Sequence, residues 1–182
     1  MPDRQPVVAL LRGINLGGHN RVSMPELRSL LVAAGFEDVR TILQSGNVIV
    51  TPPGKGVPRI GAAIEKAIED GFGLGIRVMT RTREELAAII AGNPFLDPGA
   101  DPKFLHTVFL DTAPEQHRVG DLDPDRSPPD RFSVSGREIY VQYPAGSGRS
   151  KLNLDYFEKK LGVAGTARNW NTVTKLLALL GE

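Results

Sequence analysis

The chain has 182 residues, of which 41% are hydrophobic and 24% charged, so it can form one large or two small domains and is not a disordered chain. No apolar run approaches the roughly 18 residues of a membrane-spanning helix, and the N-terminus does not resemble a signal peptide, so we predict a cytoplasmic protein without a membrane partner. The net charge of +1 provides no overall attraction to nucleic acid, and the absence of cysteine excludes disulfides and thiolate metal sites.

The first half of the chain alternates short apolar runs with segments of helical periodicity. A continuous apolar run at residues 7–14 is typical of a buried central strand, and two further runs flank a glycine-containing turn at residues 44–47. The predicted elements are strands at 7–14, 39–43, 48–51 and 76–79, and helices from Met24, over 60–72 and from Thr82 to Ile90. Their order, β-α-β-β-α-β, is the split βαβ or ferredoxin-like arrangement.

Capping signals mark where the helices of this half begin. Ser23 with Glu26 and Thr82 with Glu85 each have the spacing of a capping box, in which a hydroxyl and a carboxylate satisfy backbone N–H groups. We therefore expect Ser23 and Thr82 to cap helices through their side chains.

The second half repeats the same order after a connector rich in proline and aspartate at residues 93–102. The predicted elements are strands at 103–110, 132–134, 138–142 and 165–168, a poor helix at 114–119, and helices at 150–161 and 172–180. We therefore predict an α+β fold, a tandem duplication of two ferredoxin-like units each followed by a helix, with halves at 1–92 and 103–182.

The start of the last helix lacks the acids that its counterpart carries. If the halves correspond, MTRTREEL at residues 79–86 matches TARNWNTV at residues 166–173, and Glu84 and Glu85 are replaced by uncharged residues. A helix N-terminus favours negative charge, so an uncompensated start beside Arg168 is suited to an external anion.

A structural interpretation of the same stretch is about equally favoured. In it, Asn171 or Thr172 caps the helix, Trp170 packs on the core, and Arg168 pairs with an acid elsewhere in the chain. Under either interpretation, we predict that Trp170 is a packing residue.

Two glycine-rich stretches precede helices. Residues 12–21, RGINLGGHNR, lack the spacing of a nucleotide-binding fingerprint, and their glycines permit either a tight turn or a functional loop. Residues 145–151, AGSGRSK, contain the residue types of a phosphate-binding loop, but not in the order of that motif. An exposed linker is therefore favoured, although Lys151 could reach an anion.

The histidines His19, His106 and His117 are too scattered for a metal site, and we predict neither metal nor cofactor. No nucleophile motif is present. His19, in the first glycine-rich loop, is the one candidate for acid or base catalysis, although a loop histidine is more often simply solvated.

Four stretches together resemble one known family. They are LLRGINLGGHNRVSMPELRSLL, TILQSGNVIV, SKLNLDYFEKKLG and TARNWNTVTKLL, and they extend over nearly the whole chain. In these stretches the chain resembles the bacterial family called domain of unknown function 1697. The resemblance implies a two-part α+β fold with ferredoxin-like halves and implies no activity or catalytic residue.

We predict from these features a protein that binds a phosphate-bearing ligand, either a nucleotide or a nucleic-acid end, between the first glycine-rich loop and the start of the last helix. The alternatives are an enzyme that acts on a small phosphorylated substrate with His19 as acid or base, and an interaction module whose polar motifs are structural; protein partners cannot be read from the sequence. The predicted ligand-binding residues are Arg12, Asn15, Asn20, Gln44, Asn47, Lys151, Arg168, Asn169 and Asn171.

Overall fold

The computed structural model describes residues 4–54 and 59–182. The chain divides into two compact units, which are described separately below: unit 1 comprises Met1–Leu86 with Leu179–Glu182, and unit 2 comprises Ala87–Ala178. Within the described ranges, none of the helices has the length and apolar character needed to cross a membrane.

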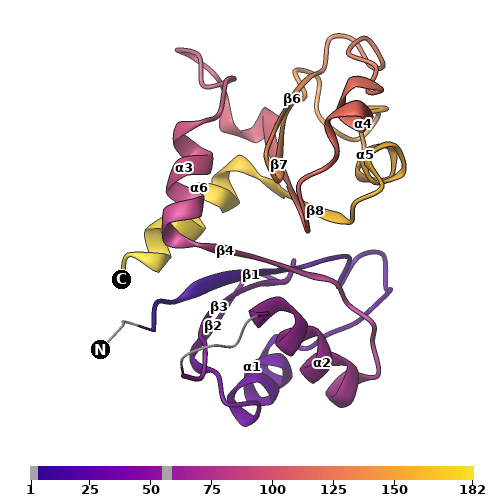
Figure 1. Cartoon of the computed structure of the whole chain (residues 1–182). Coiled ribbons are helices and arrows are strands. Elements are labelled where there is room, and N and C mark those ends of the chain that lie inside the picture. Colours follow the sequence, from indigo (N-terminus) through magenta and orange to yellow (C-terminus); the bar gives the residue numbers. More distant parts are fainter. Residues whose placement is uncertain (1–3, 55–58) are drawn as a thin grey trace. The chain divides into compact units, whose positions relative to one another are not determined.

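Unit 1 is a four-stranded antiparallel sheet with two helices on one face (Figure 1). Its elements are β1 (Val7–Leu11), α1 (Met24–Ala33), β2 (Glu37–Ile42), β3 (Asn47–Thr51), α2 (Ile60–Phe72) and β4 (Val78–Thr82). The strand order is β2-β3-β1-β4, so the first strand lies in the interior of the sheet between β3 and β4. The predicted element order is therefore correct for this unit.

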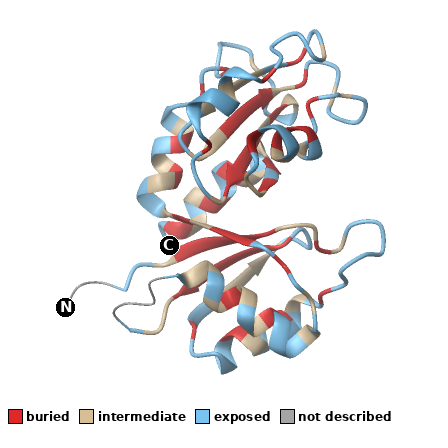
Figure 2. Cartoon of the chain, turned by 45° about the vertical axis from the view of Figure 1, so that its right-hand side comes forward, coloured by how far each residue is buried: buried red, intermediate tan, exposed pale blue. Residues whose placement is uncertain are grey.

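The central position of β1 explains why all of its side chains are apolar and buried. Val7, Ala9 and Leu11 pack with the inward residues of α1 and α2, including Leu27 and Ile64, in one hydrophobic core. The alternate residues of β1 are buried as well, so both faces of this strand are covered. Figure 2 shows that the buried residues of the unit follow its central strands.

Unit 2 has the same element order and the same sheet order. Its elements are β5 (Leu105–Leu110), α4 (Gln116–Gly120), β6 (Arg131–Ser135), β7 (Glu138–Gln142), α5 (Leu154–Leu161) and β8 (Gly165–Asn169), with a short 3-10 helix, η1 (Pro102–Phe104), before β5. All pairs in the order β6-β7-β5-β8 are antiparallel. Two α+β units with the same connectivity are consistent with the predicted duplication.

One helix follows the last strand of each sheet. α3 (Arg83–Ala91) follows β4, and α6 (Trp170–Leu180) follows β8. The Thr82 capping box is confirmed in full, because Thr82 Oγ1 accepts from the Glu85 N–H at 3.1 Å and Glu85 Oε2 accepts from the Thr82 N–H at 2.8 Å. Ser23 also caps its helix, by accepting from the Glu26 N–H at 3.4 Å.

Several predicted boundaries are wrong for local reasons. The fourth strand was predicted at 76–79, but β4 begins at Val78 and extends through Arg81, whose side chain is buried. α5 begins at Leu154 because the Asn153 side chain caps it, four residues later than predicted. In the β2–β3 turn, Gly46 has the expected positive φ, but the second such residue is Leu43 rather than Asn47.

Candidate functional site

The glycine-rich loop between β1 and α1 has a defined and unusual backbone. Ile14 is buried and anchors the loop to the core of unit 1, and Leu16 and His19 form an isolated bridge. Residues with positive φ are frequent in it: Gly13, Asn15, Gly17, Gly18 and Asn20. The loop is therefore more than a tight connection between a strand and a helix.

Asn15 joins this loop to the β2–β3 turn. Its Nδ2 donates to the carbonyl oxygens of Val22 at 3.0 Å and Gln44 at 2.9 Å, and its Oδ1 accepts from the Val22 N–H at 2.9 Å. The Asn15 amide thus holds together two segments that are 29 residues apart.

The two other predicted asparagines of unit 1 also stabilise these segments. Asn20 Nδ2 donates to the Gly13 carbonyl at 3.1 Å, across the base of the loop. Asn47 is buried, and its Nδ2 donates to the Ile42 carbonyl and to Ser45 Oγ, each at 3.0 Å. The structure gives each amide a role in shaping the loop or the turn, and a direct role in ligand binding stays a prediction for them.

A polar pocket of about 450 Å³ lies where the loop, the turn and the start of α1 meet. We call it the loop pocket. Its lining residues are Asn15, Gly18, Arg21, Val22, Ser23 and Gln44. The structure therefore brings together two of the predicted residues, Asn15 and Gln44, with Arg21, which sequence reasoning missed.

Arg21 is the cation of the loop pocket. Its side chain is exposed, and within the part of the chain that the structure describes it makes no hydrogen bond or ion pair. A Cβ atom added to Gly18 would lie 3.8 Å from Arg21 Nη2, so the guanidinium lies against the loop backbone. Its charge is available to an external group.

Carboxylates are absent from the two segments that form the pocket. The sequence contains no Asp or Glu from residue 4 to residue 25 or from residue 39 to residue 64. This absence is a signal in the sequence that raises the positive charge of the pocket segments as a whole, but it does not distinguish Arg21 from Arg12.

The remaining candidates of unit 1 lie outside the lining. Arg12 is half-buried at the end of β1, and its backbone N–H donates to the Arg77 carbonyl at 2.9 Å. His19 is exposed in the loop. Acid or base catalysis by His19 stays a prediction.

Arg168 is buried in unit 2, with 7% of its surface exposed. Its Nη1 donates to Thr166 Oγ1 at 2.7 Å and to the Ala167 carbonyl at 2.8 Å. Burial lowers the pKa of its guanidinium to about 10, because removal from water disfavours the charged form. The contact of Arg168 with an anion stays a prediction.

The start of α6 is capped by a residue that the structural interpretation had not chosen. Asn169 Oδ1 accepts from the Asn171 N–H at 2.9 Å, so Asn169 is the cap rather than Asn171 or Thr172. Trp170 is 5% exposed, which confirms it as a packing residue. Lys151 has an exposed side chain, and its backbone is bonded to Ser127 and Arg126.

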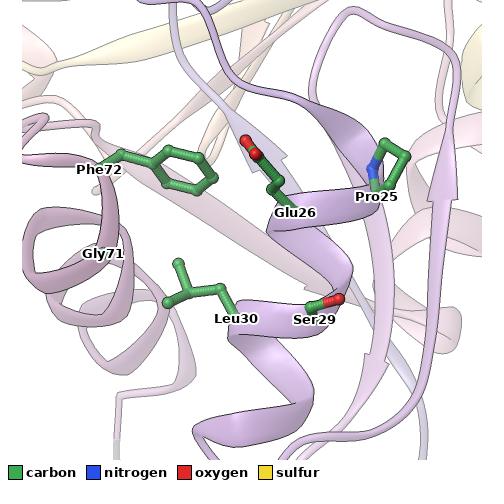
Figure 3. A pocket seen from close by; sticks show the side chains of 6 residues that line it. All are labelled: Pro25, Glu26, Ser29, Leu30, Gly71 and Phe72. Carbon is green, nitrogen blue, oxygen red and sulfur yellow. The ribbon is translucent and has the colours of Figure 1, made fainter.

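A second pocket of unit 1 lies between α1 and α2, with a volume of about 560 Å³ (Figure 3). Its lining residues are Pro25, Glu26, Ser29, Leu30, Gly71 and Phe72. The Glu26 side chain lines this groove instead of completing the capping box, so only half of that motif forms. Sequence reasoning did not identify this groove.

Among the described residues, no three His, Asp or Glu side chains are placed to hold a metal ion together.

The family model described as "Protein of unknown function (DUF1697)" matches residues 5–140. A solved structure described as that of a conserved bacterial protein from Streptococcus pneumoniae is 20% identical, with a TM-score of 0.76, and the match covers 98% of this chain and 99% of that one. This likeness shows the fold alone. The comparison with curated proteins finds no match.

Proposed function

Because this chain belongs to the DUF1697 family of proteins of unknown function, its function must be inferred from its own site, and we propose that the loop pocket binds a phosphate-bearing ligand. One observation carries the proposal: the guanidinium of Arg21, which has no partner among the described residues, lines the pocket in segments that lack carboxylates. A dianionic group such as phosphate is the natural counterpart of such a cation.

The chemistry of the pocket suits phosphate oxygens in particular. Arg21 can donate two parallel N–H bonds to them, which a lysine cannot do in the same geometry. The N-terminus of α1 also borders the pocket at Ser23, and the positive end of the helix dipole favours an anion there. This second contribution is smaller, since Ser23 caps the helix and Glu26 lies in its first turn.

The other predicted residues of unit 1 divide into three roles. Asn15, Asn20 and Asn47 are positioning residues, because their amides hold the loop and the turn in place. Gln44 is exposed at the pocket and would contact the uncharged part of the ligand. Arg12, at the end of β1, would add a second positive charge.

Unit 2 contains further candidate residues for a ligand contact. Lys151, Arg168, Asn169 and Asn171 stay candidates for a ligand contact in unit 2, where the lack of acids in the first turn of α6 supports an anion. The β-α-β-β-α-β order and the antiparallel sheet support a ferredoxin-like identity for each unit. A cytoplasmic location stays a prediction from the sequence.

Isothermal titration with pyrophosphate tests the proposal. Arg21→Gln removes the cation and should weaken binding about 10- to 100-fold, because hydrogen bonds to a charged group contribute about 1.5–3 kcal/mol. Arg149→Gln is the matched control, since Arg149 is an exposed arginine in the glycine-rich stretch of unit 2. Equal losses in both variants would indicate a general charge effect and contradict a specific site.

A further inference from the structure

Two exposed leucines are chain neighbours of residues that line the loop pocket. Leu16 is 63% exposed and Leu43 is 54% exposed, and only Val32 and Leu96 join them among the large apolar side chains that stand exposed in the described residues. Leu16 follows the pocket residue Asn15 in the chain, and Leu43 precedes the pocket residue Gln44. Two of these four side chains are therefore next in the chain to residues that line one polar pocket.

The leucines lie on segments that are fixed to each other. The hydrogen bond from Asn15 Nδ2 to the Gln44 carbonyl joins the residue next to Leu16 to the residue next to Leu43. Ile14 and Gly46 also pack closely, because a Cβ atom added to Gly46 would lie 2.9 Å from Ile14 Cδ1. Apolar surface and the Arg21 charge are thus held near the same point of unit 1.

The backbone of Leu43 provides an independent reason to expect a function there. Its φ is 60°, in the left-handed region that glycine and asparagine tolerate and that bulky side chains disfavour. Within unit 1, this conformation leaves the leucine side chain exposed and gains it no burial. An unfavourable backbone that presents an apolar side chain to solvent points to a ligand that covers it.

We infer that the ligand of the loop pocket is a nucleotide, whose phosphate binds Arg21 and whose base covers Leu43 and Leu16. This inference rests on the proposed function and specifies its ligand. A base combines an apolar face, which the leucines would contact, with a polar edge, which the exposed Gln44 amide can pair with by two hydrogen bonds. A sugar phosphate would place hydroxyl groups against the leucines, and inorganic phosphate would leave them uncovered.

The size of the pocket is compatible with this ligand. Its volume of about 450 Å³ falls in the range of roughly 300–1,000 Å³ that is usual for small-molecule sites. The phosphate and sugar would occupy the pocket, and the base would extend over its edge onto the leucines.

The test compares the affinities of adenosine, guanosine, cytidine and uridine monophosphates with that of ribose 5-phosphate, by isothermal titration on the full chain. At least one nucleotide should bind tenfold or more tightly than ribose 5-phosphate. Leu43→Asn should remove this preference and leave the affinity for ribose 5-phosphate unchanged. Because asparagine tolerates positive φ, the variant should keep the melting temperature of the parent protein. Leu96→Asn, at an exposed leucine of unit 2, is the control that should change nothing.

The outcomes separate this inference from the proposed function. Ribose 5-phosphate binding that depends on Arg21, without any gain from a base, would overturn the nucleotide and retain the phosphate site. The absence of binding by every phosphate compound would overturn both. The last arm measures binding to vesicles that contain anionic phospholipid. If the protein binds these vesicles through Leu16 and Leu43 and shows no preference for nucleotides, the ligand is a lipid surface and the nucleotide is overturned.

Discussion

The connections that follow the first strand of the two units differ in both length and charge. In unit 1, residues 12–23 join β1 to α1, contain no acid and form the loop pocket with the β2–β3 turn. In unit 2, residues 111–115 join β5 to the much shorter α4 and include Asp111 and Glu115. The two sheets have the same order, so the difference lies in the connection and not in the sheet.

This difference shows how a duplicated architecture can carry one proposed site. The hairpin turns diverge in the same way, since the turn after β2 contributes Gln44 to the pocket while only Gly136 and Arg137 join β6 to β7. Loops tolerate changes in length and charge that a packed sheet does not. We therefore expect substitutions in the two cores to act alike and substitutions in the two connections to act differently.

The largest expected effects are in the cores, where the units should behave equally. Leu27 of unit 1 and Phe157 of unit 2 are fully buried. Truncation leaves a cavity, so Leu27→Ala should lower the free energy of unfolding by about 2–5 kcal/mol and Phe157→Ala by about 3–5 kcal/mol. Urea denaturation followed by circular dichroism measures both. A change below about 0.5 kcal/mol in either variant would mean that its core is assigned wrongly.

Alanine substitution of the glycine in each hairpin turn should lower the stability of unit 1 more than that of unit 2. A Cβ atom on Gly46 would lie 2.9 Å from Ile14 and Leu11 atoms, whereas one on Gly136 would lie no closer than 3.8 Å to a Glu138 oxygen. Both have positive φ, so both alanine variants carry the backbone cost, of roughly 1–2 kcal/mol. Gly46→Ala should cost about 1–3 kcal/mol more because of crowding. Equal melting temperatures for the two variants would contradict the close packing of loop and turn.

Asn15 should matter more than Asn20 within the loop itself. Asn15→Gly keeps a residue that accepts positive φ and loses three hydrogen bonds, while Asn20→Gly loses one. We expect Asn15→Gly to lower the free energy of unfolding by about 1–2 kcal/mol, and Asn20→Gly by about half as much. The Val22 N–H donates a hydrogen bond to Asn15 Oδ1, so its hydrogen exchange should accelerate only in Asn15→Gly.

The smallest expected effect concerns pH and His106, whose counterpart in unit 1 is the non-titratable Val7. His106 lies opposite Asn169 in the sheet of unit 2, as Val7 lies opposite Thr82 in the sheet of unit 1. The buried Nδ1 of His106 has no hydrogen-bond partner in the described residues. Burial lowers the pKa of His106 below its usual 6.5, so the unfolded chain takes up a proton first as the pH falls. Stability should therefore be complete above pH 6.5 and decline from there down to the lowered pKa.

His106→Val makes unit 2 resemble unit 1 at this position and should flatten that decline. Urea midpoints at a series of pH values measure the slope for both proteins. An unchanged slope in the variant would mean that other groups account for the pH dependence.

Local chemistry explains which features the sequence could predict. The apolar run around Val8, the Thr82–Glu85 capping box and the helix stop at Gly162, whose φ is 69°, depend on residues close together in the chain. The buried Arg81 could not be predicted, because charged residues are usually exposed and its burial depends on tertiary packing.

The candidate site was predictable only in part. Asn15 and Gln44 were predicted, but the bond that brings them together links residues 29 positions apart, which no local pattern encodes. The positive φ of Leu43 contradicts its own conformational preference, so it could be found only in the structure. Arg21 was passed over in favour of Arg12 because position within a loop cannot show which arginine remains without a partner.

Mapping of pyrophosphate binding by amide chemical shifts in nuclear magnetic resonance spectra tests the central claim most directly. The account predicts that the largest shifts occur at the N–H groups of Gly18, Arg21, Val22, Ser23 and Gln44. Residues 111–115 of unit 2 should stay unchanged, and the shifts should disappear in Arg21→Gln. Shifts confined to Asn169 and Asn171 at the start of α6, or shifts that survive in Arg21→Gln, would contradict the loop pocket as the phosphate site.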